Sequence, residues 1–347
     1  MMHPERWEAG SMFQWEADIS SPTLSLPQPS VSYLVCRHAI AALCAAQPNR
    51  PVLWLPTFFC PEVARFCRSV AQIREYRDDC RWHEPDWSSL QPGSNDLVLA
   101  VNYFGVRSPE PWIRWHEQRP CILVEDHTQD PFSSWSLRSN ADYAVCSVRK
   151  TLPVPDGAIV WSPRRLPLPA PPAEDHWRGS MLKLSAMVYK RDYLAGTIPA
   201  GCKDRYRELQ LSGEQELGTA AISSMSPVSE AVLAVGIPDR WRKRRIENTR
   251  GLLRSLEGWK TAVPVFTTWP EGHAPFDVPL VFPDQTARDQ CQRELQSQNI
   301  FCPVEWVCDT PDQVASDLSS RILSIPTDCR YTAEDMARIS SALLRIG

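Results

Sequence analysis

The chain has 347 residues, of which 43% are hydrophobic and 22% charged, a composition typical of a globular protein with one large and one smaller domain. Its net charge of −4 implies no basic face and so gives little support to a nucleic-acid-binding role. No run of about 18 apolar residues predicts a membrane-spanning helix, and residues 1–10 lack an apolar signal core, so we expect a cytoplasmic protein. None of the twelve cysteines forms a Cys-x-x-Cys pair, which predicts reduced thiols and no metal site.

The first half of the chain alternates strand-like and helix-like segments. Short apolar runs predict strands at 52–55, 96–104, 121–124, 141–148 and 157–162. Helices are predicted at 62–71, at 110–118 and from Arg37 and His38 through Ala46. The apolar runs do not alternate cleanly with polar residues, a pattern typical of strands covered on both faces in a mostly parallel sheet.

The second half predicts a smaller unit. A proline-rich connection at 163–172 precedes a helix at 177–194, and a long basic helix at 240–256 links the two domains. A strand at 278–282, a helix at 287–299, a strand pair at 301–307 and 322–325, and a last helix opened by the capping box of Thr332 and Asp335 follow. We therefore predict a large α/β domain at 1–239 and a small C-terminal α/β domain at 240–347.

Three candidate site residues follow strand ends or open a helix. Asp126 follows the strand at 121–124, Lys150 follows the strand at 141–148, and Arg37 opens a helix. Ligands of open α/β sheets bind outside the carboxyl ends of the strands, so these residues are expected near one site.

These residue types match the needs of pyridoxal 5′-phosphate (PLP). A lysine amine forms the Schiff base, a carboxylate holds a proton on the pyridine nitrogen, and a helix N-terminus with hydroxyls or an arginine binds the phosphate. Each residue taken alone has an ordinary alternative: a solvated lysine after a strand, an aspartate in a turn, an arginine at a helix start, or a serine at a strand end.

Several segments, in order over most of the chain, resemble the PLP-dependent nucleotide-sugar aminotransferases of the DegT/StrS type, which have fold type I. The segments are LVCRHAIAAL (34–43), LPTFFCPEVA (55–64), VNYFGV (101–106), LVEDHTQD (123–130), ADYAVCSVRKTLPVPDGAIVW (141–161), NIFCPVEW (299–306) and ILSIPTDCRYTAEDMARI (322–339). The resemblance implies a fold-type-I large domain with a small C-terminal domain, PLP as cofactor, and a homodimer with sites at the subunit interface.

The resemblance also implies roles for individual residues. Lys150 would carry PLP and move the α-proton, Asp126 would pair with the pyridinium nitrogen, and Gln129 would lie near the ring. Ser147, Arg37 and the backbone at Cys36 and Arg37 would bind the phosphate. We also expect an aromatic contact with the ring from Phe58, Phe59 or Tyr103. A further contact with the ring is expected from His127.

The chain departs from the usual pattern at three of these positions. Ser147 and Lys150 are three residues apart, where the family usually has Ser-x-x-x-x-Lys, so the chain resembles a divergent branch. Cys36 stands where a glycine is usual in the phosphate turn, and His127 stands where the family has a small residue.

The leading functional hypothesis is an aminotransferase that moves an amino group from a small-molecule donor such as glutamate to a keto acceptor, which is a sugar or another biosynthetic intermediate. Other PLP reactions (lyase, dehydratase, condensation) and a non-catalytic scaffold with the same fold remain open alternatives. A nucleotide-binding Rossmann protein is disfavoured, because no Gly-x-Gly-x-x-Gly or Gly-x-x-x-x-Gly-Lys-Ser/Thr motif is present.

Overall fold

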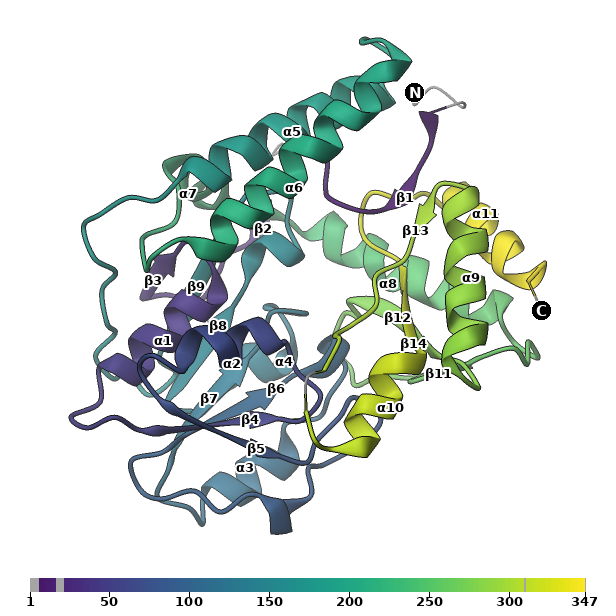
Figure 1. Cartoon of the computed structure of the whole chain (residues 1–347). Helices are drawn as coiled ribbons and strands as arrows, with labels where there is room; N and C mark the ends of the chain where they lie inside the picture. The colour runs from purple at the N-terminus through teal and green to yellow at the C-terminus, as the bar shows by residue number, and fades with distance from the viewer. Residues whose placement is uncertain (1–5, 17–21, 309, 347) are drawn as a thin grey trace.

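The computed structural model describes residues 6–16, 22–308 and 310–346, and its main element is a seven-stranded sheet (Figure 1). In spatial order the strands are β3 (Ser30–Tyr33), β9 (Ala158–Trp161), β8 (Tyr143–Cys146), β7 (Ile122–Asp126), β6 (Leu97–Val101), β4 (Val52–Pro56) and β5 (Gln72–Tyr76). Strands β5, β4, β6, β7 and β8 pair in parallel, whereas β9 is antiparallel to both β8 and β3. The predicted mostly parallel sheet is confirmed, and β3 and β5 are strands that were not predicted.

Strand β6 shows why the apolar runs do not alternate with polar residues. All of its residues are buried. Its odd-numbered side chains pack in one core with helices α1 (Cys36–Ala45) and α2 (Pro61–Cys67). Its even-numbered side chains pack in a second core with tryptophans of α3 (Glu110–His116) and α4 (Ser134–Leu137). Because helices cover both faces, both sets of side chains are apolar.

The carboxyl ends of the central strands lie at one edge of the sheet. Val101 pairs with Asp126, and Asp126 pairs with Val145, so β6, β7 and β8 end nearly level. The predicted helix from Arg37 through Ala46 is confirmed as α1, and its N-terminus lies at this same edge. This alignment brings residues from four separate segments to one place.

A helical hairpin projects from the body of the molecule (Figure 1). It consists of α5 (Arg178–Leu194), which was predicted, and α6 (Lys203–Thr219), which was not; α7 (Pro227–Val235) follows. The two helices cross closely at Gly179 and Gly213, where a β-carbon on Gly179 would lie 2.8 Å from the carbonyl oxygen of Gly213. Only glycine allows this approach.

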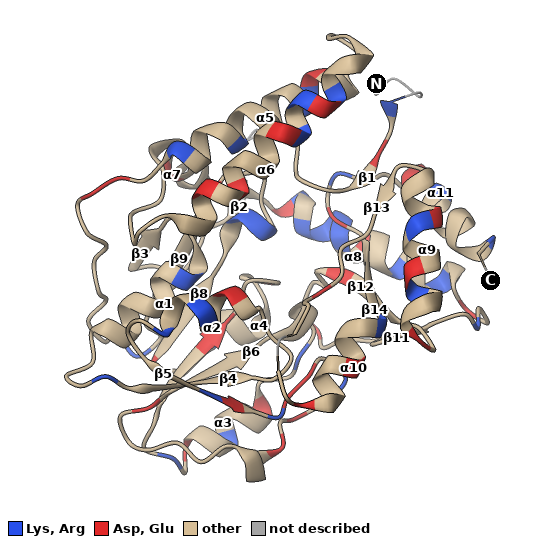
Figure 2. Ribbon diagram, in the orientation of Figure 1, with Lys and Arg blue, Asp and Glu red and all other residues tan. Residues whose placement is uncertain are grey.

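The C-terminal part combines a three-stranded antiparallel sheet with helices. The strands are β11 (Val263–Pro264), β12 (Asp277–Val281) and β14 (Ile322–Pro326), and the helices are α8 (Asp239–Ser255), α9 (Gln285–Ser297), α10 (Gln313–Arg321) and α11 (Ala333–Leu344). Lysine and arginine gather on α8, the predicted basic helix (Figure 2). The predicted capping box is confirmed, because Asp335 N donates to the Thr332 hydroxyl while Thr332 N donates to the Asp335 carboxylate.

The predicted strand pair at 301–307 and 322–325 is wrong. Strand β14 pairs with β12, and the first of the two segments forms only β13 (Ile300–Phe301), which pairs in parallel with β1 (Ala9–Gly10). Pro303 has no N–H to donate to a ladder, so the segment leaves the sheet after two residues.

Residues near the N-terminus pack into the C-terminal core. Trp7 and Ala9 are buried there with residues of α8, α9 and α11. A second short pair, β2 (Pro22–Leu24) with β10 (Ile237–Pro238), also joins distant segments.

The domain division at 239/240 stays a prediction. Across the described residues, no helix combines the length and apolar character needed to cross a membrane.

Candidate active site

A cavity lies at the carboxyl ends of β6 and β7, beside the N-terminus of α1. Its lining consists of Val35, Cys36, Arg37, Phe59, Cys60, Glu62, Val63, Val101, Asn102, Asp126, Thr128, Gln129, Ser147, Arg149, Lys150 and Trp306. Seven residues predicted from the sequence are therefore in one cavity: Cys36, Arg37, Phe59, Asp126, Gln129, Ser147 and Lys150.

Lys150 reaches the cavity because β8 ends at Cys146 and a short 3₁₀ turn, Val148–Lys150, carries the chain back over the strand ends. Its Nζ atom lies 5.7 Å from the centroid of the Trp306 ring. Trp306 also packs against Phe58 and Phe59, at ring-centroid distances of 5.3 and 5.5 Å. An aromatic wall therefore covers the lysine on one side.

Asp126 is the last residue of β7, and only 7% of it is exposed. Its Oδ1 accepts a hydrogen bond of 2.8 Å from Thr128 N. Burial raises the pKa of the Asp126 carboxyl, and hydrogen bonds from Thr128 and the charge of Lys150 offset part of that rise. A positively charged partner at this carboxylate would therefore be strongly stabilised.

The N-terminus of α1 offers backbone donors to the cavity. Val35, its N-cap, makes no side-chain cap, and both Cys36 and Arg37 line the cavity. The first N–H groups of a helix have no partner within it, and they attract anions. Ser147 lies next to them, held by its N–H, which donates to Thr128 Oγ1 at 3.0 Å.

Gln129 carries an unpaired donor in this cavity. Its Oε1 accepts from the Phe104 N–H, whereas its Nε2 is buried and has no hydrogen-bond partner among the described residues. A buried donor without an acceptor is costly, so this amide indicates that a ligand with an acceptor atom belongs here.

The side chain of Arg37 is directed away from the backbone donors. Its guanidinium donates to the Leu217 carbonyl at the end of α6 and lies 5.6 Å from the Phe66 ring centroid. Burial lowers the pKa of the Arg37 guanidinium. Arg149, by contrast, lines the cavity with its Nη1 2.8 Å from Glu214 Oε1.

Three predicted residues do not line the cavity. His127 is fully buried between the Trp135 and Trp161 rings, with its Nε2 3.0 Å from Glu125 Oε2. Phe58 and Tyr103 pack against each other and against Trp306, and the Tyr103 hydroxyl donates to the Phe58 carbonyl at 2.7 Å. The expected ring contacts of these three are therefore not supported by their positions.

The sequence reasoning missed several lining residues, of which Trp306, Thr128 and Asn102 are the most notable. Thr128 lies in the acidic motif, between Asp126 and Gln129, and this position could have identified it as a site residue. Trp306 comes from the C-terminal part, and nothing in the sequence places it over Lys150. No group of three or more potential metal ligands is found in the described ranges.

No family model matches the chain, and no curated protein matches its sequence. Solved structures do match. The aminotransferase TlmJ from Streptoalloteichus hindustanus superposes with a TM-score of 0.61 at 13% identity, over 91% of this chain and 85% of its own. This chain has the aminotransferase fold.

Two further structures support that assignment. A DegT DnrJ EryC1 StrS aminotransferase from Brucella abortus has a TM-score of 0.58 at 14% identity, covering 90% of this chain and 84% of its own. An E. coli GDP-4-keto-6-deoxy-D-mannose-3-dehydratase with bound hydrated PLP has a TM-score of 0.58 at 12% identity, covering 90% and 87%. The predicted fold type I is confirmed.

Proposed function

We propose that the chain is a PLP-dependent aminotransferase. The observation that carries the proposal is the convergence of Lys150, Asp126, Ser147 and the α1 N-terminus on one cavity that also contains the unpaired Gln129 amide. This donor set matches the parts of PLP: an amine for its aldehyde, a carboxylate for its ring nitrogen, and N–H and hydroxyl donors for its phosphate.

When bound, PLP would withdraw electrons from the carbon that bears the substrate nitrogen. Lys150 Nζ would hold the cofactor covalently and then, once free, move the proton at that carbon. The buried Asp126 carboxylate would keep the ring nitrogen protonated, which compensates its own desolvation.

The other lining residues position and shield the group. The Cys36 and Arg37 N–H groups and the Ser147 hydroxyl would bind the phosphate, and Gln129 Nε2 would donate to an oxygen of the ring. Phe59 and Trp306 would exclude water from Lys150.

Two further expectations belong to the same proposal. The donor would be a small amino compound such as glutamate and the acceptor a keto compound, and the protein would act as a homodimer, in line with the resemblance of its motifs. Analytical ultracentrifugation measures the second point directly, and a monomer at enzyme concentration would contradict it. The cytoplasmic location stays a prediction.

A second candidate is another PLP reaction, because the E. coli dehydratase has the same fold and binds PLP. The same cavity residues would serve either reaction, since the bond that breaks depends on how the substrate is oriented on the ring. The substrate-binding residues, rather than Lys150 and Asp126, would decide between them.

The test is an absorbance spectrum of the purified chain with added PLP, before and after borohydride and glutamate. We expect a band of lysine-bound PLP that borohydride fixes to Lys150 and that glutamate shifts to the pyridoxamine form. If borohydride fixes PLP to Lys150 but neither glutamate nor another donor changes the spectrum, the result would favour the second candidate. Absence of the band would contradict both and favour a scaffold. Lys150→Ala is the control that should show no trapping.

A further inference from the structure

A second hollow adjoins the cavity at Lys150. It is lined by three parts of the chain: α5 and α6 with the segment at 149–154 (Arg149, Lys150, Val154, Lys183, Met187, Gln210, Glu214), the N-terminal segment (Gly10, Ser11, Met12, Phe13), and the C-terminal part (Phe276, Asp277, Phe301, Cys302, Pro303, Glu305, Pro326, Asp328, Arg330). We call it the chamber. Arg149 and Lys150 line both the cavity and the chamber, so a molecule in the chamber would lie beside the lysine.

The α5–α6 wall of the chamber is positively charged. Arg149 and Lys183 both form ion pairs with the same carboxylate, Glu214. Burial, together with the charge of Arg149, lowers the pKa of Lys183 to about 8. Two cations share one anion, so this wall suits an anionic group such as a donor carboxylate.

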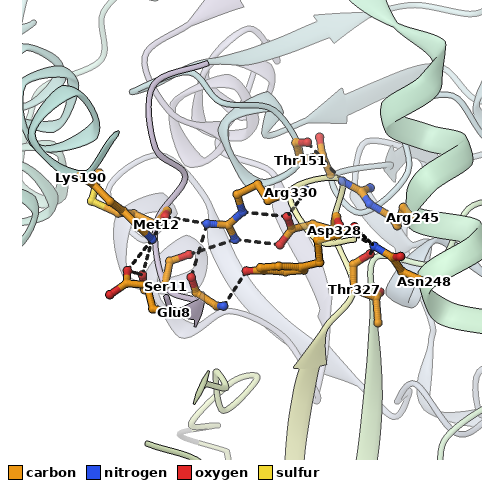
Figure 3. Close-up of polar contacts among 12 residues, drawn as sticks. Glu8, Ser11, Met12, Thr151, Lys190, Arg245, Asn248, Thr327, Asp328 and Arg330 are labelled. Carbon is orange, nitrogen blue, oxygen red and sulfur yellow. Dashed lines mark hydrogen bonds and ion pairs between the residues drawn. The ribbon is translucent and has the colours of Figure 1, made fainter. Parts of the chain in front are cut away.

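Arg330, on the opposite wall, is already engaged within the protein (Figure 3). Its Nε and Nη2 donate to the two oxygens of Asp328, both at 2.8 Å, and its Nη1 donates to the Met12 carbonyl at 2.8 Å. The guanidinium also lies 4.4 Å from the Phe13 ring centroid. Arg330 therefore holds the N-terminal segment in place and has little capacity left for a substrate carboxylate.

Two carboxylates of the same wall, Asp277 and Glu305, form no ion pair with any residue that the structure describes. Glu305 is 9% exposed, lines the chamber and has no hydrogen bond or ion pair within the described part of the chain. Asp277 is 6% exposed, lines the chamber and accepts a hydrogen bond from the backbone N–H of Thr327. Burial, and then the charges of Asp328 and Glu305, raise the pKa of Asp277, while Arg245 offsets only part of this.

Arg245 does not neutralise this pair. Its Nη2 donates to the Thr151 carbonyl at 3.2 Å, and it packs against the Phe276 ring at 5.8 Å from the centroid. Two neighbouring, largely buried carboxylates that are compensated only in part by Arg245 are unfavourable in a protein. A cation from outside would compensate them, and an ammonium group, with three donors and one charge, matches two carboxylates.

We propose that Asp277 and Glu305 bind a protonated amino group of the substrate, so that the keto acceptor already carries one amino group and its product carries two. This inference rests on the proposed function for the identity of the reacting end at Lys150. The substrate class is then an amino-bearing ketone or aldehyde. The positive wall at Arg149 and Lys183 would serve the donor carboxylate.

The experiment uses calorimetric titration of the purified full chain with diamines from 1,3-diaminopropane to 1,6-diaminohexane, which mimic the product. Monoamines of the same carbon number are the reference ligands. We expect one diamine length to bind about tenfold more tightly than its monoamine, the scale of one charged hydrogen bond. Equal affinity across the whole series would overturn the proposal.

Variants assign the effect to the two carboxylates. Asp277→Asn and Glu305→Gln should each remove most of the diamine preference, whereas Glu257→Gln, an exposed glutamate outside the chamber, should retain it. Asp277 accepts a backbone hydrogen bond, so its variant is first checked by circular dichroism. If it does not fold, Glu305→Gln carries the test, because Glu305 has no hydrogen bond or ion pair to lose among the residues that the structure describes. Retained preference in that variant would contradict the proposal.

The outcomes also separate this inference from the proposed function. Trapping of PLP on Lys150 without any diamine preference would leave the aminotransferase proposal standing and refute the ammonium site. A diamine preference lost in Glu305→Gln, in a chain that shows no PLP band, would support the ammonium site and refute the aminotransferase proposal.

Discussion

Replacement of Arg330 by methionine tests whether its ion pair with Asp328 stabilises the wall of the chamber. Both side chains are about 10% exposed, and two hydrogen bonds of 2.8 Å join them. Breaking a buried ion pair by removing one partner costs about 3–5 kcal/mol, because the remaining charge is left uncompensated. The lost contacts with Met12 and Phe13 act in the same direction. We therefore expect Arg330→Met to lower the free energy of unfolding by at least ~3 kcal/mol.

The pH dependence identifies the cause of that loss. In the wild-type chain, Arg330 and its hydrogen bonds hold the pKa of Asp328 below its usual value despite burial, so the pair stabilises the fold above the unfolded-state pKa of about 4 and loses this effect as pH falls through the lower folded-state pKa. Without Arg330, burial would raise the pKa of Asp328. The deficit of the variant should then be smallest at pH values below the folded-state pKa of Asp328 in the wild-type chain, and it should grow as pH rises.

Urea denaturation of Arg330→Met at several pH values measures both effects, and limited proteolysis of the N-terminal segment reports whether residues 10–13 are released. The matched variant is Arg330→Met combined with Asp328→Asn, which removes both charges and should recover part of the stability. A loss below about 1 kcal/mol, or a deficit independent of pH, would refute this account of the pair.

Three other predictions concern the site and the N-terminal segment. Asp126→Asn should retain PLP in the absorbance spectrum and lose most turnover, and equal activity would exclude its proposed role at the ring nitrogen. Trp306→Ala should speed the borohydride reduction of PLP at Lys150, because the ring above Nζ is removed; an unchanged rate would show that Trp306 does not shield it. Glu8 has a pKa lowered to about 2, since Lys190, Tyr206 and Lys203 outweigh its burial, so it stabilises the fold above about pH 4.5 and loses this effect toward pH 2. Glu8→Gln should therefore flatten the pH dependence of unfolding in that interval, and a curve parallel to wild type would contradict the ion pair.

The sequence alone was sufficient for the parts of the site that depend on local order. Asp126 and Lys150 each follow a run of apolar residues, and such runs become neighbouring parallel strands whose carboxyl ends meet. The capping box at Thr332 is likewise set by residues within one helical turn. These features are decided by short-range periodicity and capping, which can be read along the chain.

Tertiary structure alone decided the rest. Trp306 lies over Lys150 although the two are far apart in sequence, and Trp7 joins a core built from the C-terminal third of the chain. His127 was expected near the ring, but it is buried with Glu125 and two tryptophans, away from the cavity. The chamber with its unpaired Glu305 combines α5, α6, the N-terminal segment and the C-terminal part. Local propensity carries no information on such contacts, because they depend on which distant surfaces bury each other when the chain packs.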